Sequence, residues 1–161
     1  GFGALALICL LVFVGAAGKI LDELLASADI RRQDVYITNI VKDRPPFNRD
    51  PQPEEIAAYG PFLDRQIRII QPEVIATLGR YAMGYIMEKF GLSGQMEPIS
   101  RMHGRVVEAA APYGTIRIVP LYHPCVAIYN RSRLDTLKTD FQVLREFPPE
   151  PRKQEGNMLS L

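Results

Sequence analysis

Short apolar runs alternate along the chain with segments in which apolar residues recur at helical spacing. The apolar runs predict strands at 4–14, 35–41, 73–78, 105–108 and 116–121, of which 35–41 is rich in β-branched residues. The helical spacing predicts helices over 18–28, from Pro53 to about 70, from 80 to about 90, and over roughly 133–146. Strands that alternate with helices indicate a three-layer α/β/α fold with a central, mainly parallel sheet.

The first 18 residues, GFGALALICLLVFVGAAG, carry no charge. Their length is at the lower limit for a membrane helix, and LVFVGAA could end a signal peptide. No basic residue precedes the run, so we favour a buried strand within ALALICLLVFV and keep membrane attachment as a weaker alternative. The chain does not begin with Met, and we expect a truncated or altered amino terminus.

Composition places the chain among soluble globular proteins. Its 161 residues are 47% hydrophobic and 23% charged, which suits one domain over residues 1–147 and a polar, Pro-rich, disordered tail over 148–161. The net charge of +1 gives no overall signal for nucleic acid, although local basic loops could still contact phosphates. The two cysteines, Cys9 and Cys125, lie far apart, which favours a reducing cytoplasm over a disulfide framework.

Three residues fall at the carboxyl ends of expected strands, namely Asn39, Gly79 and His123. In α/β sheets ligands bind at that edge. An asparagine amide offers a donor and an acceptor side by side, so Asn39 could read the edge of a nucleobase. Each residue also has a plainer interpretation, because Asn39 could stabilise a turn and His123 could be a structural histidine.

Four motifs occur together in this sequence, in the order TNIVKDRPPFNRDPQPEEI, PFLDRQIRIIQPEVIATLGR, ISRMHGR and VPLYHPCVAIYN. Their order and spacing over about residues 12–145 resemble the family 4 uracil-DNA glycosylases. The resemblance implies a four-stranded central sheet, a monomer, and an enzyme of DNA repair. Such an enzyme flips uracil out of DNA and hydrolyses its N-glycosidic bond, which leaves an abasic site.

The resemblance also implies roles for single residues. Phe13 would stack on the extruded uracil, Asn39 would pair with uracil N3–H and O4, and His123 would lie against uracil O2 as the catalytic residue. Phe13 could otherwise be a core residue. The residues that would contact DNA are Arg101, His103, Arg105, Cys125, Tyr129 and Asn130. The first three could instead form a solvated loop.

Two departures from the family pattern affect cofactor and activity. Members of the family hold a four-iron four-sulfur cluster through four cysteines, but Asp43 and Tyr59 stand at two of those positions and the amino-terminal pair is missing. We therefore expect no cluster and no other metal. A GExPG-type acidic loop is also missing, because no acid lies between Gly1 and Lys19. We expect reduced or absent glycosylase activity, with a non-catalytic DNA- or protein-binding derivative as the alternative.

Overall fold

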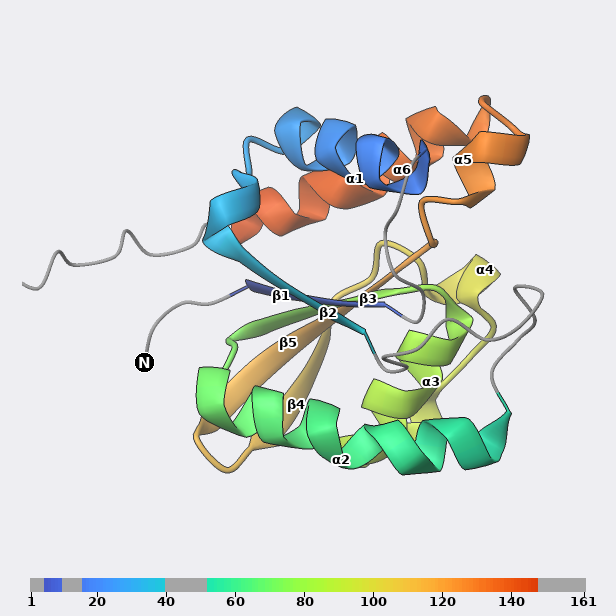
Figure 1. Ribbon diagram of the computed structural model, residues 1–161. Coiled ribbons are helices and arrows are strands. Elements are labelled where there is room, and N and C mark those ends of the chain that lie inside the picture. Colours follow the sequence, from blue (N-terminus) through green and yellow to red (C-terminus); the bar gives the residue numbers. More distant parts are fainter. Residues whose placement is uncertain (1–4, 10–15, 40–51, 148–161) are drawn as a thin grey trace, which may run out of the picture.

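The computed structural model describes residues 5–9, 16–39 and 52–147, which form one sheet with helices on both faces (Figure 1). The strands are β1 (Leu5–Cys9), β2 (Val35–Asn39), β3 (Val74–Leu78), β4 (Val107–Ala111) and β5 (Gly114–Leu121). Their order in the sheet is β2-β1-β3-β5-β4. The strands β2, β1, β3 and β5 run parallel to one another. The α/β architecture is therefore confirmed.

The sheet has one strand more than the four that the family resemblance implies, because β4, close to the strand expected at 105–108, adds a fifth, antiparallel strand at one edge. Only Pro112 and Tyr113 separate β4 from β5. A two-residue connection can join antiparallel neighbours but cannot make a parallel crossover. The sheet is therefore mixed, with the hairpin partner of β5 outside the parallel part.

The apolar amino-terminal run supplies the strand β1, which pairs with β2 on one side and β3 on the other. This confirms the strand interpretation for residues 5–9. In the described ranges no helix is both long enough and apolar enough to cross a membrane. Phe13 and Asp43 lie outside the described residues.

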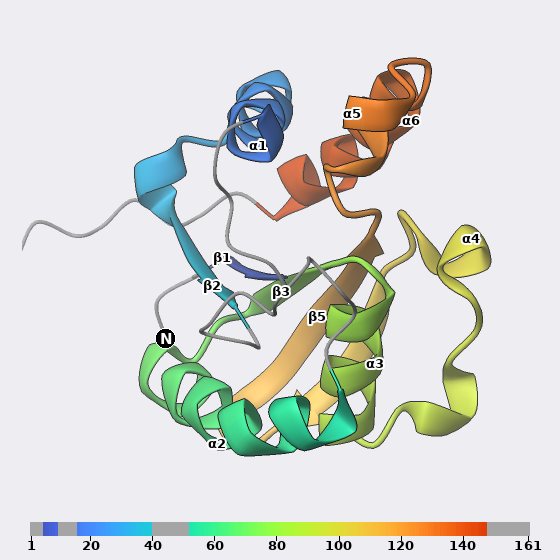
Figure 2. The same ribbon diagram turned by 45° about the vertical axis from the view of Figure 1, so that its right-hand side comes forward.

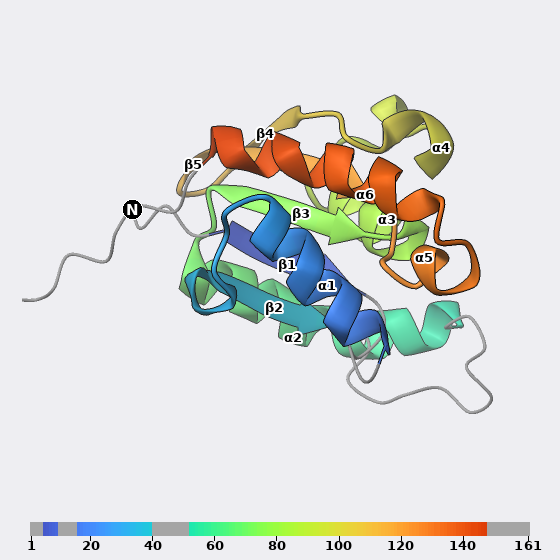
Figure 3. The same cartoon turned by 90° about the horizontal axis from the view of Figure 1, so that it is seen from above.

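Helices form a layer on each side of the sheet (Figures 1 and 2). One layer contains α1 (Ala16–Ser27), α5 (Val126–Tyr129) and α6 (Arg133–Phe141), and Figure 3 shows α1 and α6 side by side above the strands. The other layer contains α2 (Pro53–Ile70) and α3 (Arg80–Lys89). The short helix α4 (Ile99–Met102) lies beyond α3. The expected helix over 133–146 divides into α6 and a 3-10 segment at Gln142–Glu146.

Strand β3 separates the two halves of the core. All five of its residues are buried, as expected for a parallel strand covered on both faces. Val74, Ala76 and Leu78 face the α1 and α6 layer, and Ile75 faces the α2 and α3 layer. This alternation explains why its sequence is apolar throughout.

Helix α2 begins at Pro53, as the sequence predicts. A proline suits the first helical position because its missing N–H would have no helical partner there. The Glu55 carboxylate accepts a hydrogen bond from the backbone N–H of Gln52 at 3.4 Å. At the sheet, Thr38 Oγ1 donates to Gln66 Oε1 of α2 at 2.6 Å. This bond ties α2 to β2 one residue before Asn39.

Candidate active site

The carboxyl ends of the parallel strands meet at one edge of the sheet. Cys9 of β1 is in register with Asn39 of β2 and with Leu78 of β3, and Leu78 is in register with Leu121 of β5. Asn39 therefore ends β2 at the edge where His123 follows β5. Three strand spacings separate these two strands, roughly 14 Å between their backbones.

Gly79 allows the chain to pass close to His123. It follows β3 directly, and its backbone N–H donates to Leu121 O at 2.8 Å. Its φ is +91°, and a Cβ atom there would lie 3.4 Å from His123 Cβ. A side chain at this position would be strained by the backbone and would crowd the histidine.

The imidazole of His123 is held in one protonation state. Its Nδ1 accepts a hydrogen bond from the backbone N–H of Cys125 at 3.0 Å, and burial lowers the pKa of His123 to about 4. The ring is therefore neutral at pH 7. Because Nδ1 uses its lone pair as an acceptor, the single ring proton is on Nε2, which makes Nε2–H a hydrogen-bond donor.

The residues after His123 lead into α5 and are exposed from residue 128 to residue 130. Tyr129 is 89% exposed, and the Asn130 side-chain oxygen accepts a hydrogen bond from the backbone N–H of Ser132 at 3.2 Å. Burial raises the pKa of the Cys125 thiol, so that thiol remains protonated at neutral pH. Cys125 therefore acts through its backbone N–H on His123, and it is not an activated nucleophile.

The loop of the ISRMHGR motif lies beside the end of β5. The Gly104 N–H donates to Pro120 O at 2.8 Å, and the His103 ring lies 4.6 Å from the ring of Tyr122. Arg101 is exposed at the end of α4. Arg105 forms an exposed ion pair with Glu97 at 3.1 Å. The structure thus places the ISRMHGR loop against Tyr122, the residue before His123.

Comparison of the sequence with known proteins identifies the family. A sequence model of the uracil DNA glycosylase superfamily covers residues 8–146. The chain belongs to that superfamily. It is 44% identical over 134 residues to the type-4 uracil-DNA glycosylase of Archaeoglobus fulgidus, a match over 83% of this chain and 66% of that protein. It is 42% identical over 142 residues to that of Sulfurisphaera tokodaii, over 88% of this chain and 64% of that protein.

The chain spans slightly less than two thirds of the length of these curated relatives. A third type-4 enzyme, from Saccharolobus solfataricus, is 42% identical over 83% of this chain and 62% of its own length. Type-5 uracil-DNA glycosylase of Pyrobaculum aerophilum is more distant, at 33% identity over 69% of this chain. The family resemblance drawn from the sequence motifs is therefore confirmed.

One member of this site could not be named from the sequence motifs. Asp140 of α6 has a side chain only 9% exposed, and its Oδ2 lies 2.7 Å from His103 Nδ1. Burial raises the pKa of Asp140, and the hydrogen bond with His103 opposes that rise. The sequence shows only that Asp140 shares a helical face with the apolar Leu134, Leu137 and Phe141, which indicates burial but not a partner.

The position of Tyr59 does not fit an iron–sulfur cluster in this superfamily member. Tyr59 is half-buried on α2 and packs against the core cluster that contains Leu63 and Ile67. A phenol there supplies no thiolate. In the part of the chain that the structure describes, no three His, Cys, Asp or Glu side chains gather in a way that could hold a metal ion. Asp43, the second residue that stands where the family pattern has a cysteine, lies outside the described residues.

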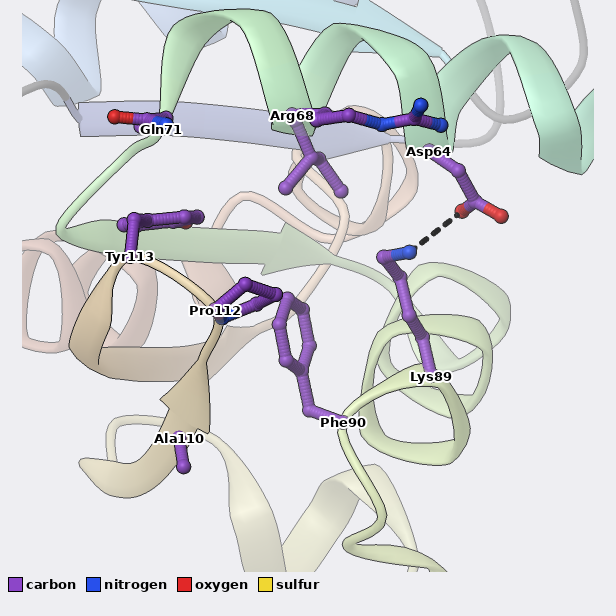
Figure 4. Close-up of a pocket in the computed structure, with 9 residues that line it drawn as sticks. Asp64, Arg68, Gln71, Lys89, Phe90, Ala110, Pro112 and Tyr113 are labelled. Atoms are coloured by element: carbon purple, nitrogen blue, oxygen red, sulfur yellow. Dashed lines mark ion pairs between the residues drawn. The ribbon is translucent and has the colours of Figure 1, made fainter.

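A cavity of about 740 Å³ lies at the opposite edge of the sheet (Figure 4). Its lining comes from the ends of α2 and α3 and from the β4–β5 turn, with Tyr113 Oη donating to Pro72 O at 2.8 Å. Lys89 Nζ lies 3.2 Å from Asp64 Oδ1 at its side. Residues 71–72 precede β3 and residues 112–113 precede β5, so this cavity lies at the strand starts, away from His123.

Proposed function

We propose that this chain is a uracil-DNA glycosylase that removes uracil from DNA and leaves an abasic site. The observation that carries the proposal is the neutral His123, with its proton on Nε2, at the strand edge that Asn39 also reaches. The type-4 relatives support the reaction, since they are uracil-DNA glycosylases. The substrate is uracil-containing DNA, and we propose that the protein acts as a monomer in the cytoplasm.

The chemistry suits a neutral donor. When the bond between uracil N1 and the sugar C1′ breaks, its electron pair goes to the uracil and positive charge gathers on the sugar. Water then adds its hydroxyl to C1′ and releases a proton. A donor fixed against uracil O2 stabilises the leaving anion more than the neutral base, which lowers the barrier. We propose that Nε2–H of His123 is this donor.

We propose that Asn39 makes the site selective for uracil. The amide can accept from uracil N3–H and donate to O4, whereas cytosine presents the opposite pattern and leaves the amide mismatched. The separation of roughly 14 Å between β2 and β5 leaves room for two side chains and one planar ring. Phe13, proposed to stack on that ring, lies outside the described residues.

The proposed reaction uses no iron–sulfur cluster, and we propose that the ring of Tyr59 fills space that cysteine ligands would otherwise occupy. Its packing against the α2 and α3 core supports this proposal. No step of the mechanism above depends on a metal. Iron analysis and the absorbance of purified protein near 400 nm would detect a cluster if one is present.

A second candidate function is DNA binding without catalysis. The absence of any Asp or Glu between Gly1 and Lys19 favours this function, because no side chain in that segment can activate the attacking water. For this reason we also propose that excision by this chain is slow.

The test is a single-turnover assay with excess protein and an oligonucleotide that carries one uracil. We expect slow excision of uracil and none of thymine, with a large loss of rate in His123→Ala. Binding of the uracil oligonucleotide without any excision would support the second candidate instead. A rate in the unaltered chain equal to that of the Archaeoglobus fulgidus enzyme would contradict the proposed impairment.

A further inference from the structure

The segment that carries His123 is fixed by contacts from outside its own strand. Pro120 O accepts a hydrogen bond from Gly104 N–H, and Leu121 O accepts one from Gly79 N–H, each at 2.8 Å. Tyr122, the next residue, contacts the ring of His103 at 4.6 Å between centroids, with 31° between the ring planes. The three residues before His123 are therefore each held by a loop from another part of the chain.

His103 is itself fixed by a carboxylate. Its Nδ1 lies 2.7 Å from Asp140 Oδ2, and the side chains of the two residues are 27% and 9% exposed. A carboxylate this buried is tolerated only when it is paired, because an unpaired charge there is costly. The pair thus restricts the His103 ring to one orientation, the one in which it lies against Tyr122.

Gly104 makes the close approach of this pair possible. Its φ is +78°, and a Cβ atom at this position would lie 2.7 Å from Asp140 Oδ1. The loop therefore needs a glycine next to His103 for Asp140 to reach the ring. The Arg133 guanidinium also lies 5.6 Å from the centroid of the Tyr122 ring, so α6 contacts Tyr122 through Arg133 and His103 through Asp140.

We propose that His103 and Asp140 are positioning residues that hold Tyr122, and through it His123, in the geometry needed for uracil excision. This inference rests on the proposed function and reassigns His103, which the sequence places among DNA contacts. The pair touches neither the base nor the reacting bond. Its effect comes from placing the His123 donor, because a shift of about 1 Å at a catalytic group can cost up to roughly 100-fold in rate.

The test separates positioning from DNA contact by measuring two quantities. One is the single-turnover excision rate at saturating protein, and the other is the Kd for a duplex with a non-cleavable 2′-fluorinated deoxyuridine. Asp140→Ala is expected to lower the rate by roughly tenfold and to change the Kd by less than about twofold. Asp140→Asn keeps the shape and an acceptor for His103, so we expect it to retain most of the rate.

Asp135→Ala is the matched control, because Asp135 is an exposed aspartate on the same helix. We expect it to leave the rate and the Kd unchanged. His103→Phe keeps a ring against Tyr122 but loses the hydrogen bond to Asp140, so we expect an intermediate loss of rate. If Asp140→Ala does not fold, Asp140→Asn and His103→Phe decide the question.

A third readout does not depend on activity. The imidazole NMR signals of His123 should move in Asp140→Ala and stay in place in Asp135→Ala. If the unaltered chain excises no uracil, the proposed function fails while this readout still tests the positioning. A folded Asp140→Ala with unchanged rate and unchanged His123 signals would overturn the inference. An increased Kd with unchanged rate in His103→Phe would overturn it in favour of a DNA contact.

Discussion

The only two histidines in the chain, His103 and His123, occupy neighbouring loops with opposite surroundings. At His123 a backbone N–H donates to Nδ1, and burial keeps the ring neutral. At His103 the same ring atom meets a buried carboxylate, to which only a protonated Nδ1 can donate. The same ring atom thus meets a backbone donor in one loop and a carboxylate in the other.

This difference assigns different roles to the two residues. The proposed role of His123 uses its Nε2–H as the donor that stabilises the leaving anion. The Nδ1–H of His103 is used within the protein, to bind Asp140. The comparison therefore separates His123, which we propose meets the substrate, from His103, which we propose holds His123 in place. The following changes test that separation in order of decreasing effect.

The largest effect is expected from removing the His123 donor. His123→Ala should lower the single-turnover excision rate by about 10²- to 10³-fold, as loss of one oxyanion-hole donor does, with little change in DNA affinity. His103→Ala should cost roughly tenfold, because His123 remains present but less well placed. Equal losses in the two variants would remove the distinction between the histidines.

The next largest effect concerns the dependence of the free energy of unfolding on pH. Burial lowers the pKa of His123 from 6.5 to about 4, so between these values the unfolded chain binds a proton that the folded chain does not. The free energy of unfolding should therefore fall by up to about 3 kcal/mol as the pH drops from 7 to 4.

The check is urea denaturation at pH 7, 5.5 and 4 for the unaltered chain and for His123→Gln, which cannot titrate in this range. The variant should lose less stability on acidification, and the difference between the two proteins isolates His123 from other groups. Identical pH dependence in both would show that His123 is not held neutral by the fold.

A smaller effect is expected at the glycine beside His103. Gly104→Ala should destabilise the protein by about 2 to 3 kcal/mol, from the strained backbone and from contact with Asp140. Gly91 is the matched control, since its φ of +74° is similar but a Cβ atom there would have no atom within 4 Å.

Gly91→Ala should lower the free energy of unfolding only through backbone strain, by about 1 kcal/mol. Thermal or urea unfolding of both variants gives the two values. If they are equal, Asp140 adapts without cost, and the close packing around His103 does not matter.

The smallest effect tests whether the loop of His103 also contacts phosphates. Arg101 is exposed, whereas Arg105 is paired with Glu97. Arg101→Gln should therefore reduce the slope of log affinity against log salt by about 1, and Arg105→Gln by less. Binding titrations at several salt concentrations measure this, and unchanged slopes in both variants would favour a solvated loop.

The sequence predicts the framework well where local patterns decide it. Strand β3 is apolar throughout because it is buried on both faces, and α2 begins at Pro53 because a proline and two acids favour a helix start there. A strand near β4 was also predicted from the sequence, but its antiparallel pairing with β5 was not, since that pairing depends on a tight turn.

The site was predicted less completely, for physical reasons. Asn39 and His123 became candidates because they fall at expected strand ends and within motifs that resemble the family, and their roles remain predictions. Asp140 was missed because its partner lies 37 residues away in the chain, and no local pattern links them. The neutral state of His123 was also beyond prediction, because it depends on burial by distant segments and on the N–H of Cys125.

The central claim is that His123 is a neutral donor held ready by the fold, and NMR of its ¹⁵N-labelled imidazole between pH 8 and pH 4 tests it most directly. The expected result is a proton on Nε2, a bare Nδ1, and no titration until the pH approaches about 4. Titration of His123 near the ordinary value of 6.5, or a proton on Nδ1, would contradict the account.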